Sequence, residues 1–330
     1  MTRGCDTGGG PNPSGPGPTL TPVAELNPAQ RAVLDALRAP DRPRPRYDPG
    51  LRDAVRGHLE DELGELAALL DRPAVVTKRA LGEVLACEAH HVASSTAPFE
   101  WNVALARGIV VHRAIQLGVF RRDDPPPLEL VDDALDRLAD DPDAAVADYL
   151  LGLPEAERAE LRGAASEVVS AFRELWPPLA RRWLPRTETP VRAELCRGKL
   201  LFTGRVDLSL GAPEGDRAGR VLVDLKSGAA SAGHLHDLRF YALLETLRSG
   251  VPPLRVATSY LEAGDLAVEE VDEDVLEAAV RRTVQGTRAV LELRLGLRSA
   301  AITPNPACRW CPARTGCEGA RQWEEARLAS

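Results

Sequence analysis

The sequence contains almost no lysine. Of its 41 lysine and arginine residues, only Lys78, Lys199 and Lys226 are lysines, so arginine carries nearly all of the positive charge. A guanidinium stays protonated in proteins, whereas a buried ammonium can shift its pKa and take part in proton transfer. Because arginine suffices wherever only a positive charge is needed, we expect a lysine retained beside acidic residues to have a chemical role.

Dense cysteines, long apolar runs and repeats are also missing. Six cysteines in 330 residues are too few for a disulfide framework, and the sequence shows no secretory signal pattern. No apolar run reaches the length that spans a membrane, and we find neither an internal repeat nor a Walker A motif. These absences predict a cytoplasmic protein without a membrane anchor or an ATP-driven motor of its own.

The net charge of −8 does not favour nucleic-acid binding, because proteins that bind nucleic acids are usually basic. The charge is uneven, however, and acidic residues concentrate in residues 121–185 and 262–277. Basic residues instead flank the candidate site that contains Asp207 and Asp224: Arg192, Arg197, Lys199, Arg205, Arg220, Arg239, Arg309 and Arg314. A local basic groove can bind phosphates despite an acidic total, with an affinity that falls steeply as salt rises.

The chain divides into an extension and one elaborated domain. Residues 1–45 are rich in glycine and proline with little apolar periodicity, which predicts a disordered extension, and residues 46–330 form the domain. Its first part has helical periodicity and includes a helical insertion at about 121–185. The later elements are expected in this order: strands near 190–210 and 219–225, a helix around Tyr241, strands near 254–261 and 265–271, and a long helix near 273–295. This order suits a mixed sheet flanked by helices.

Acidic residues lie on two successive strand-like runs. Asp207 ends the run Gly-Arg-Val-Asp, while Asp224 and Lys226 belong to the run Val-Asp-Leu-Lys, and turn-forming residues between the runs predict a hairpin. Side chains alternate along a strand, so Asp224 and Lys226 should share one face. The same alternation puts three apolar side chains on the face opposite Asp207: Val206, Leu208 and Leu210. Two carboxylates can hold a divalent cation and an ammonium can position a water, so the runs predict metal-assisted phosphodiester hydrolysis rather than a surface ion pair.

A histidine lies on an apolar helical stripe upstream of these strands. The stripe contains residues at spacings of three and four: Leu105, Gly108, His112, Ile115 and Val119. A single histidine on such a face is more often a core residue that hydrogen-bonds the backbone. Neutral imidazole is also a ligand for Mn²⁺ and a weaker one for Mg²⁺. The acidic cluster downstream favours the ligand role for His112.

Together these motifs resemble the PD-(D/E)XK nuclease superfamily, in particular its RecB-like exonuclease branch. The residues that carry the resemblance are His112 in Gly-x-x-x-His, Asp207, Asp224 with Lys226, and Tyr241 on a downstream helix. In that branch a glutamine usually lies four residues before the tyrosine, whereas this chain has Asp237 there. The resemblance implies an α/β fold of the restriction-endonuclease type, with a mixed β-sheet core, flanking helices, a helical insertion and a C-terminal cysteine loop.

The resemblance also implies residue roles and a substrate. Four groups would bind Mg²⁺ or Mn²⁺: His112, Asp207, Asp224 and the backbone carbonyl of Leu225. Lys226 would orient the attacking water, and Tyr241 would contact the substrate or support the lysine. The expected product is cleaved DNA, from a single strand or an end, in repair, recombination or CRISPR-type processing. A separate helicase, repair or CRISPR protein would then be the partner.

Two other functions remain open from the residues alone. The acidic charge and Asp237 favour a catalytically inactive DNA-binding or scaffolding subunit that keeps the nuclease fold, whereas the intact set of acidic residues, histidine and lysine argues against it. A metal-dependent hydrolase of small nucleotides is the second, and its activity would need no polymer and would be insensitive to salt.

Three cysteines near the C-terminus form a compact run. Cys308, Cys311 and Cys317 are spaced C-x2-C-x5-C in the loop 304–318, which brings their thiolates onto one centre. A closed site needs a fourth ligand, and Cys87 is the best candidate. Four cysteines can hold Zn²⁺ or an iron–sulfur cluster, and spacing does not distinguish them. RecB-like nucleases such as AddB and the CRISPR-associated exonucleases share this layout, so the resemblance implies a [4Fe–4S] cluster.

Overall fold

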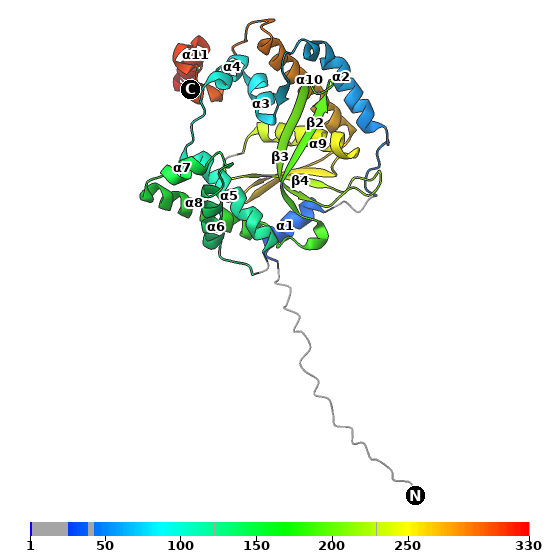
Figure 1. Cartoon of the computed structure of the whole chain (residues 1–330), viewed down its shortest axis with the longest axis vertical. Coiled ribbons are helices and arrows are strands. Elements are labelled where there is room, and N and C mark those ends of the chain that lie inside the picture. Colours follow the sequence, from blue (N-terminus) through cyan, green and yellow to red (C-terminus); the bar gives the residue numbers. More distant parts are fainter. Residues whose placement is uncertain (2–25, 39–42, 122, 229, 330) are drawn as a thin grey trace.

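The computed structural model describes residues 1, 26–38, 43–121, 123–228 and 230–329. These residues form a mixed six-stranded sheet covered by helices on both faces (Figure 1). The predicted α/β class, a helix-flanked mixed sheet, is confirmed.

The strands follow one another along the chain as β1 (Ala74–Val76), β2 (Arg186–Leu195), β3 (Leu200–Leu210), β4 (Val221–Lys226), β5 (Arg255–Tyr260) and β6 (Asp265–Glu270). In space the order is β1-β3-β4-β5-β6, with β2 also paired to β3. β1 with β3 and β4 with β5 are parallel pairs, and the other pairs are antiparallel. The predicted hairpin of the two acidic runs is the β3–β4 pair.

Strand β3 has different neighbours along its two edges. β2 pairs with it from residue 200 to residue 209, so β1 and β4 must share the opposite edge. β1 pairs only with residues 200–202 and β4 only with residues 208–210. Residues 203–207 therefore lie in a gap between two neighbouring strands, where Asp207 can reach groups on other elements.

One face of the sheet is covered by four helices: α2 (Leu51–Ala68), α3 (Lys78–Ala86), α9 (Ala232–Ser249) and α10 (Glu273–Arg294). Their apolar sides meet β3 in the first core cluster, where Phe202, Leu238 and Leu243 are fully buried. Thr77 caps α3 by accepting the backbone N–H of Ala80, so α3 begins immediately after β1 and brings Lys78 to the gap in the sheet.

The opposite face is covered by α1 (Pro28–Leu37), α5 (Val103–Phe120), α6 (Pro127–Ala139), α7 (Ala147–Gly152) and α8 (Glu155–Leu175). Their apolar sides form the second core cluster with strand residues such as Val223 and Leu225. A short 3-10 helix, Arg181–Trp183, leads into β2. The segment predicted as a helical insertion thus contains α6, α7 and α8.

The expectation of a disordered extension through residue 45 is wrong for α1. Asn27 caps this helix by accepting the backbone N–H of Gln30, and Pro28 occupies the first turn. Val33 and Leu37 are buried in the second cluster, so a short amphipathic stretch gains its stability from packing that composition does not reveal. Residues 2–25 and 39–42 lie outside the described part of the chain.

Helix α5 corrects the expectation that no apolar run could span a membrane. By length and composition alone it is apolar enough to do so, with 18 residues and a mean hydropathy of 1.4. Its buried residues, among them Val110, Val111 and Ala114, pack in the second core cluster. The helix also carries His112, so it serves here as a core helix beside the sheet.

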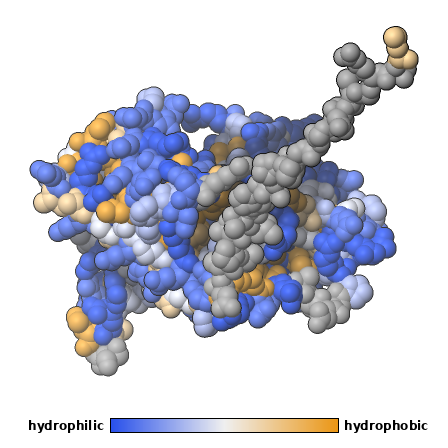
Figure 2. All heavy atoms as spheres, turned by 90° about the horizontal axis from the view of Figure 1, so that it is seen from below, coloured by the Kyte–Doolittle hydropathy of each residue, from blue (hydrophilic) through white to orange (hydrophobic). Residues whose placement is uncertain are grey.

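The C-terminal segment returns to the end of α3. It comprises two 3-10 helices, Pro306–Trp310 and Arg314–Gly316, followed by α11 (Glu318–Ala329). Cys87 lies at the junction of α3 and α4 (Glu88–Thr96), and Figure 1 shows α11 beside α4. The face of the molecule seen in Figure 2 is mainly hydrophilic and is interrupted by apolar patches.

Candidate active site

The β2–β3 ladder is irregular where it carries Asp207. Its register skips Glu188, whose backbone lies in the left-handed region with φ 49°, an uncommon conformation for a residue other than glycine. Val206 consequently packs in the first core cluster and Leu208 in the second. The expectation that these two side chains share a face is wrong, because the regular alternation is broken between them.

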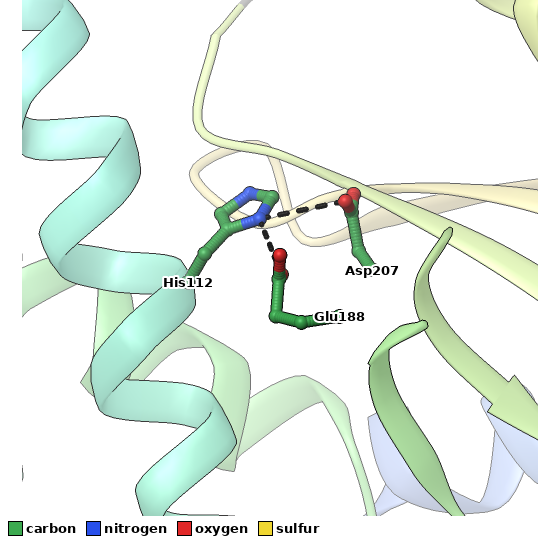
Figure 3. A group of neighbouring side chains, drawn as sticks. All are labelled: His112, Glu188 and Asp207. Atoms are coloured by element: carbon green, nitrogen blue, oxygen red, sulfur yellow. Dashed lines mark hydrogen bonds and ion pairs between the residues drawn. The ribbon is translucent and has the colours of Figure 1, made fainter. Parts of the chain in front are cut away.

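The irregularity brings Glu188 and Asp207 to the histidine of α5 (Figure 3). His112 Nδ1 lies 3.2 Å from Glu188 Oε1 and 3.5 Å from Asp207 Oδ1. One potential ligand atom from each of the three residues lies within 4.8 Å of the others. They come from three separate elements, so the group depends on the tertiary fold.

The backbone of β4 contacts this group at Leu225. The carbonyl oxygen of Leu225 is 3.2 Å from His112 Nε2, and the Leu225 N–H donates to Asp207 Oδ2 at 2.7 Å. Three of the four predicted metal ligands, His112, Asp207 and the Leu225 carbonyl, are therefore brought together. Glu188 joins them although sequence reasoning missed it.

Negative charge dominates this group. Burial disfavours the charged imidazole of His112, but the charge of Asp207 and the hydrogen bond with Glu188 outweigh it and raise the pKa of His112 to about 9. Burial, together with the nearby charges of Asp224 and Glu188, raises the pKa of Asp207 to about 6 despite the opposing effect of His112. Three carboxylates, Glu188, Asp207 and Asp224, lie close together beside one imidazole. A bound cation would reduce the repulsion between their negative charges.

Asp224 has different neighbours from those predicted. It is 1% exposed, and its two oxygens face two lysines: Oδ1 lies 2.9 Å from Lys78 Nζ, and Oδ2 lies 2.7 Å from Lys226 Nζ. Asp224 and Lys226 share a face of β4, as alternation predicts. Burial alone would raise the pKa of Asp224, but the two ammonium groups outweigh it and lower that pKa. Asp224 is not one of the three side chains within 4.8 Å of each other.

Lys78 is the second functional residue that sequence reasoning missed. Burial acts against its charge, but Asp224 outweighs that effect and raises the Lys78 pKa above its usual value. The scarcity of lysine was the available signal, since two of the three lysines meet at one carboxylate. The third, Lys199, donates instead to the backbone carbonyl of Leu70 and lies outside the group.

Tyr241 lies beneath the site rather than on its surface. It is 3% exposed, and the Lys78 ammonium lies 4.8 Å from the centre of its ring. A Cβ added at Gly204 would collide with Tyr241 Cε1, so only glycine lets the tyrosine pack against β3. This geometry suits support of a lysine, although the lysine is Lys78. Asp237, at the position expected for glutamine, lies 3.8 Å from Lys78 Nζ.

The four predicted cysteine ligands come together at the opposite end of α3. Cys87, Cys308, Cys311 and Cys317 line one small cavity. Burial raises the pKa of the Cys311 thiol, and the other three cysteines act on it in the same direction. The backbone N–H groups of Thr303 and Asn305 point at the sulfurs of Cys87 and Cys308, at 3.4 and 3.5 Å. None of the five described cysteines forms a disulfide.

Comparison with known families assigns the chain to a class. The model of the PD-(D/E)XK nuclease superfamily matches residues 77–318, and the chain belongs to this superfamily. The match runs from the cap of α3 to the start of α11, so it includes the acidic group, both lysines and all four clustered cysteines. A search of curated proteins returned no match.

Solved structures with similarity to the chain are distant. One is a protein from Eubacterium rectale whose name provisionally assigns it as an exonuclease, with 12% identity, a TM-score of 0.47, and coverage of 71% of this chain and 86% of that one. Another is SSO0001, with 12% identity, a TM-score of 0.32, and coverage of 81% and 97%. The superfamily assignment rests on the family match alone.

Proposed function

We propose that this chain is a metal-dependent deoxyribonuclease. The observation that carries the proposal is the group of side chains at the gap between β1 and β4, beside β3. There Glu188 and Asp207 meet His112, and the Leu225 carbonyl and the Asp224–Lys226 pair are adjacent. Phosphodiester hydrolysis needs a cation site and a nearby cationic side chain, and this arrangement supplies both.

The residues present fit Mg²⁺ or Mn²⁺. Two carboxylates and an imidazole form a mainly oxygen donor set, which such hard cations prefer, and the imidazole favours Mn²⁺. His112 through Nδ1, Glu188 and Asp207 would hold the ion, while the Leu225 carbonyl faces the opposite ring nitrogen, Nε2, and would orient the imidazole by accepting its N–H. When bound, the ion would polarise the scissile phosphate and lower the pKa of a water. Asp224 would not contact the ion directly; it holds the ammonium groups of Lys78 and Lys226 in position.

Lys226 is the residue that acts on the reacting groups. Its ammonium is held 2.7 Å from Asp224 Oδ2, which fixes its position while leaving N–H groups for the attacking water or for charge that develops on the phosphate. Lys78 lies near both Asp224 and Asp237, so the two lysines are balanced by two carboxylates. With a cation bound beside them, the Lys226 ammonium would be free to contact a phosphodiester.

We also propose that the four cysteines hold a [4Fe–4S] cluster. Around one zinc ion the thiolates would lie about 4 Å apart, given Zn–S distances of about 2.3 Å in a tetrahedron. Among the described residues, no three cysteine sulfurs lie within 4.8 Å of one another, which favours a larger group. The N–H groups directed at two sulfurs fit the hydrogen bonding that tunes such clusters. Structural Zn²⁺ remains the alternative.

For the substrate we propose single-stranded or end-containing DNA, processed in repair, recombination or a CRISPR-type pathway with a separate motor or partner protein. The supporting feature is the placement of two of the three lysines of the chain, Lys78 and Lys226, beside the proposed cation site. Binding of a phosphate backbone by cationic side chains falls steeply with salt. The free cysteines suit a reducing compartment such as the cytoplasm.

The test is degradation of end-labelled single-stranded and duplex DNA with Mg²⁺ or Mn²⁺, using protein purified without oxygen. Lys226→Ala should abolish cleavage, whereas Lys199→Ala, which removes a lysine bonded to Leu70, should retain it. The position of the label then shows whether cleavage proceeds from the 5′ or the 3′ end. Metal-independent cleavage, or equal activity of the two variants, would contradict the proposal. DNA binding without cleavage would instead favour a scaffolding subunit.

A further inference from the structure

A cavity of 290 Å³ lies between helices α3, α9 and α10, next to the lysine pair. Polar side chains that line it are Lys78, His236, Asp237, Arg282 and Thr283. Its volume is at the lower end of the range for ligand pockets, roughly 300–1,000 Å³. Because Lys78 borders both this cavity and Asp224, a group bound here would be a direct neighbour of the proposed reaction site.

Arg282 brings a charge without a close partner to the cavity. It makes no ion pair or hydrogen bond within 4.0 Å among the described residues; burial lowers its pKa, and the attraction of Asp237 opposes that effect only in part. Arg281, the preceding residue on α10, instead pairs with Glu277 at 2.5 Å and is 61% exposed. A partly buried guanidinium without a partner is costly, and its planar set of donors suits phosphate.

His236 supplies a second unmet group. Its Nδ1 is buried and has no hydrogen-bond partner, and the ring lines the same cavity. Asp237 is the one carboxylate among the lining residues; it lies 3.8 Å from Lys78 and also attracts Arg282. The lining thus holds two cationic side chains and one carboxylate. A partly buried charge without a close partner is rare in folded proteins, which points to a ligand for Arg282, with the His236 ring as a neighbouring wall of the cavity.

We propose that this cavity binds a phosphate of the substrate strand adjacent to the one being cleaved, through Arg282 and His236. The inference rests on the proposed function, since it supposes a nucleic-acid substrate. A phosphate offers several acceptor oxygens to the guanidinium and to the imidazole N–H, and it restores the charge balance of the cavity. The phosphate is either internal to the strand or a terminal phosphate at its end.

The experiment compares Arg282→Gln with Arg281→Gln in the cluster-loaded protein. Each removes one arginine charge from neighbouring positions on α10, but only Arg282 lines the cavity. Affinity for fluorescent single-stranded DNA is measured over a salt series in Ca²⁺, by anisotropy. Arg282→Gln should weaken binding about 10-fold and lower the salt slope by about 0.7, whereas Arg281→Gln should change neither.

The probes distinguish the two sources of phosphate. They are linear strands with a 5′-phosphate, a 3′-phosphate or hydroxyl ends, and a circular strand. An equal loss on all of them supports an internal phosphate, and a loss confined to one phosphorylated end supports a terminal one. His236→Gln is the second variant and should weaken binding of the same probes, with melting curves to establish folding. If both variants bind as Arg281→Gln does, the inference is overturned.

Failure of this inference and failure of the proposed function have different signatures. Cleavage by the wild type with identical behaviour of the Arg282 and Arg281 variants overturns the phosphate site alone. Binding that depends on Arg282 without any cleavage overturns the nuclease assignment and supports the phosphate site. Absence of DNA binding by the wild type overturns both.

Discussion

Two ammonium groups meet one buried carboxylate in this protein, and this unequal pairing explains several properties of the site. Asp224 is almost fully buried, yet it is compensated twice, by Lys78 and Lys226. A buried charge that loses its partners is strongly destabilising. Lys78 would therefore keep Asp224 compensated if Lys226 contacted a phosphate, as in the proposed reaction.

Replacement of Lys78 should cost stability as well as activity. Lys78→Met keeps the aliphatic stem but removes the charge-assisted hydrogen bond to Asp224, and we expect the free energy of unfolding to fall by about 1.5–3 kcal/mol. Lys199→Met, which loses a hydrogen bond to a backbone carbonyl, should cost about 0.5–1.5 kcal/mol. Denaturant unfolding measures both. Equal costs for the two variants would count against a special pairing at Asp224.

Glu188 should contribute directly to metal affinity. Glu188→Gln removes one carboxylate charge from the group with His112 and Asp207, and we expect the affinity for Mn²⁺ to fall by at least about 10- to 100-fold. Glu194→Gln changes an exposed glutamate of the same strand and should leave that affinity unchanged. Calorimetric titration with Mn²⁺ gives the comparison. Wild-type affinity in Glu188→Gln would remove this residue from the site.

At the scale of secondary structure, the close packing of α9 on β3 supports the site from below. Gly204→Ala would push Tyr241 away from the strand and should destabilise the protein by about 1–3 kcal/mol. Gly163→Ala, in α8 where an added Cβ meets nothing within 4 Å, should be neutral or stabilise by up to about 1 kcal/mol. Thermal melting of both variants tests this. A Gly204→Ala protein that melts like the wild type would show that α9 is not closely packed there.

Most elements of the core could be predicted from sequence because they have a local signal, whereas α1 and β1 could not. The apolar runs of β3 and β4 and the spacing around His112 identified those strands, the helix and the residues Asp207, Asp224 and His112. Glu188 could not be found in this way, since it reaches the site only through a left-handed backbone at a position where the β2–β3 ladder lacks one pair. The contact of Lys78 with Asp224 depends on where α3 lies relative to β4. Neither the apolar pattern nor the helix propensity of the sequence contains that information.

Helix α4 is held to the C-terminal segment by a carboxylate. Glu88 pairs with Arg298 and accepts the backbone N–H of Ala301, and these two interactions lower the pKa of Glu88 from 4.5 to about 2. A lowered carboxyl pKa gives stability that is present above the unfolded value and is lost as pH falls toward 2. The protection factor of the Ala301 amide, which is its exchange rate relative to an unstructured peptide at the same pH, should therefore fall between about pH 4.5 and pH 2 in the wild type. In Glu88→Gln the protection factor should already be low at neutral pH; a protected amide there would contradict this account.

For the whole molecule, the cysteine group links segments far apart in the chain. Cys87 precedes α5, and the other three follow α10, so one bound group would join both ends of the nuclease core. Cys317→Ser should lose iron and visible absorption and should melt at a lower temperature. Cys196→Ser, outside the group, should keep both. Retention of iron in Cys317→Ser would contradict the assignment, and zinc in place of iron in the wild type would identify the alternative metal.

A divalent cation should bind at His112, Glu188 and Asp207, and an anomalous difference map from crystals grown with Mn²⁺ would locate it. We expect a peak between His112 Nδ1 and the two carboxylates, and loss of that peak in Asp207→Asn. A well-ordered site without a manganese peak, or a peak held elsewhere, would contradict this expectation.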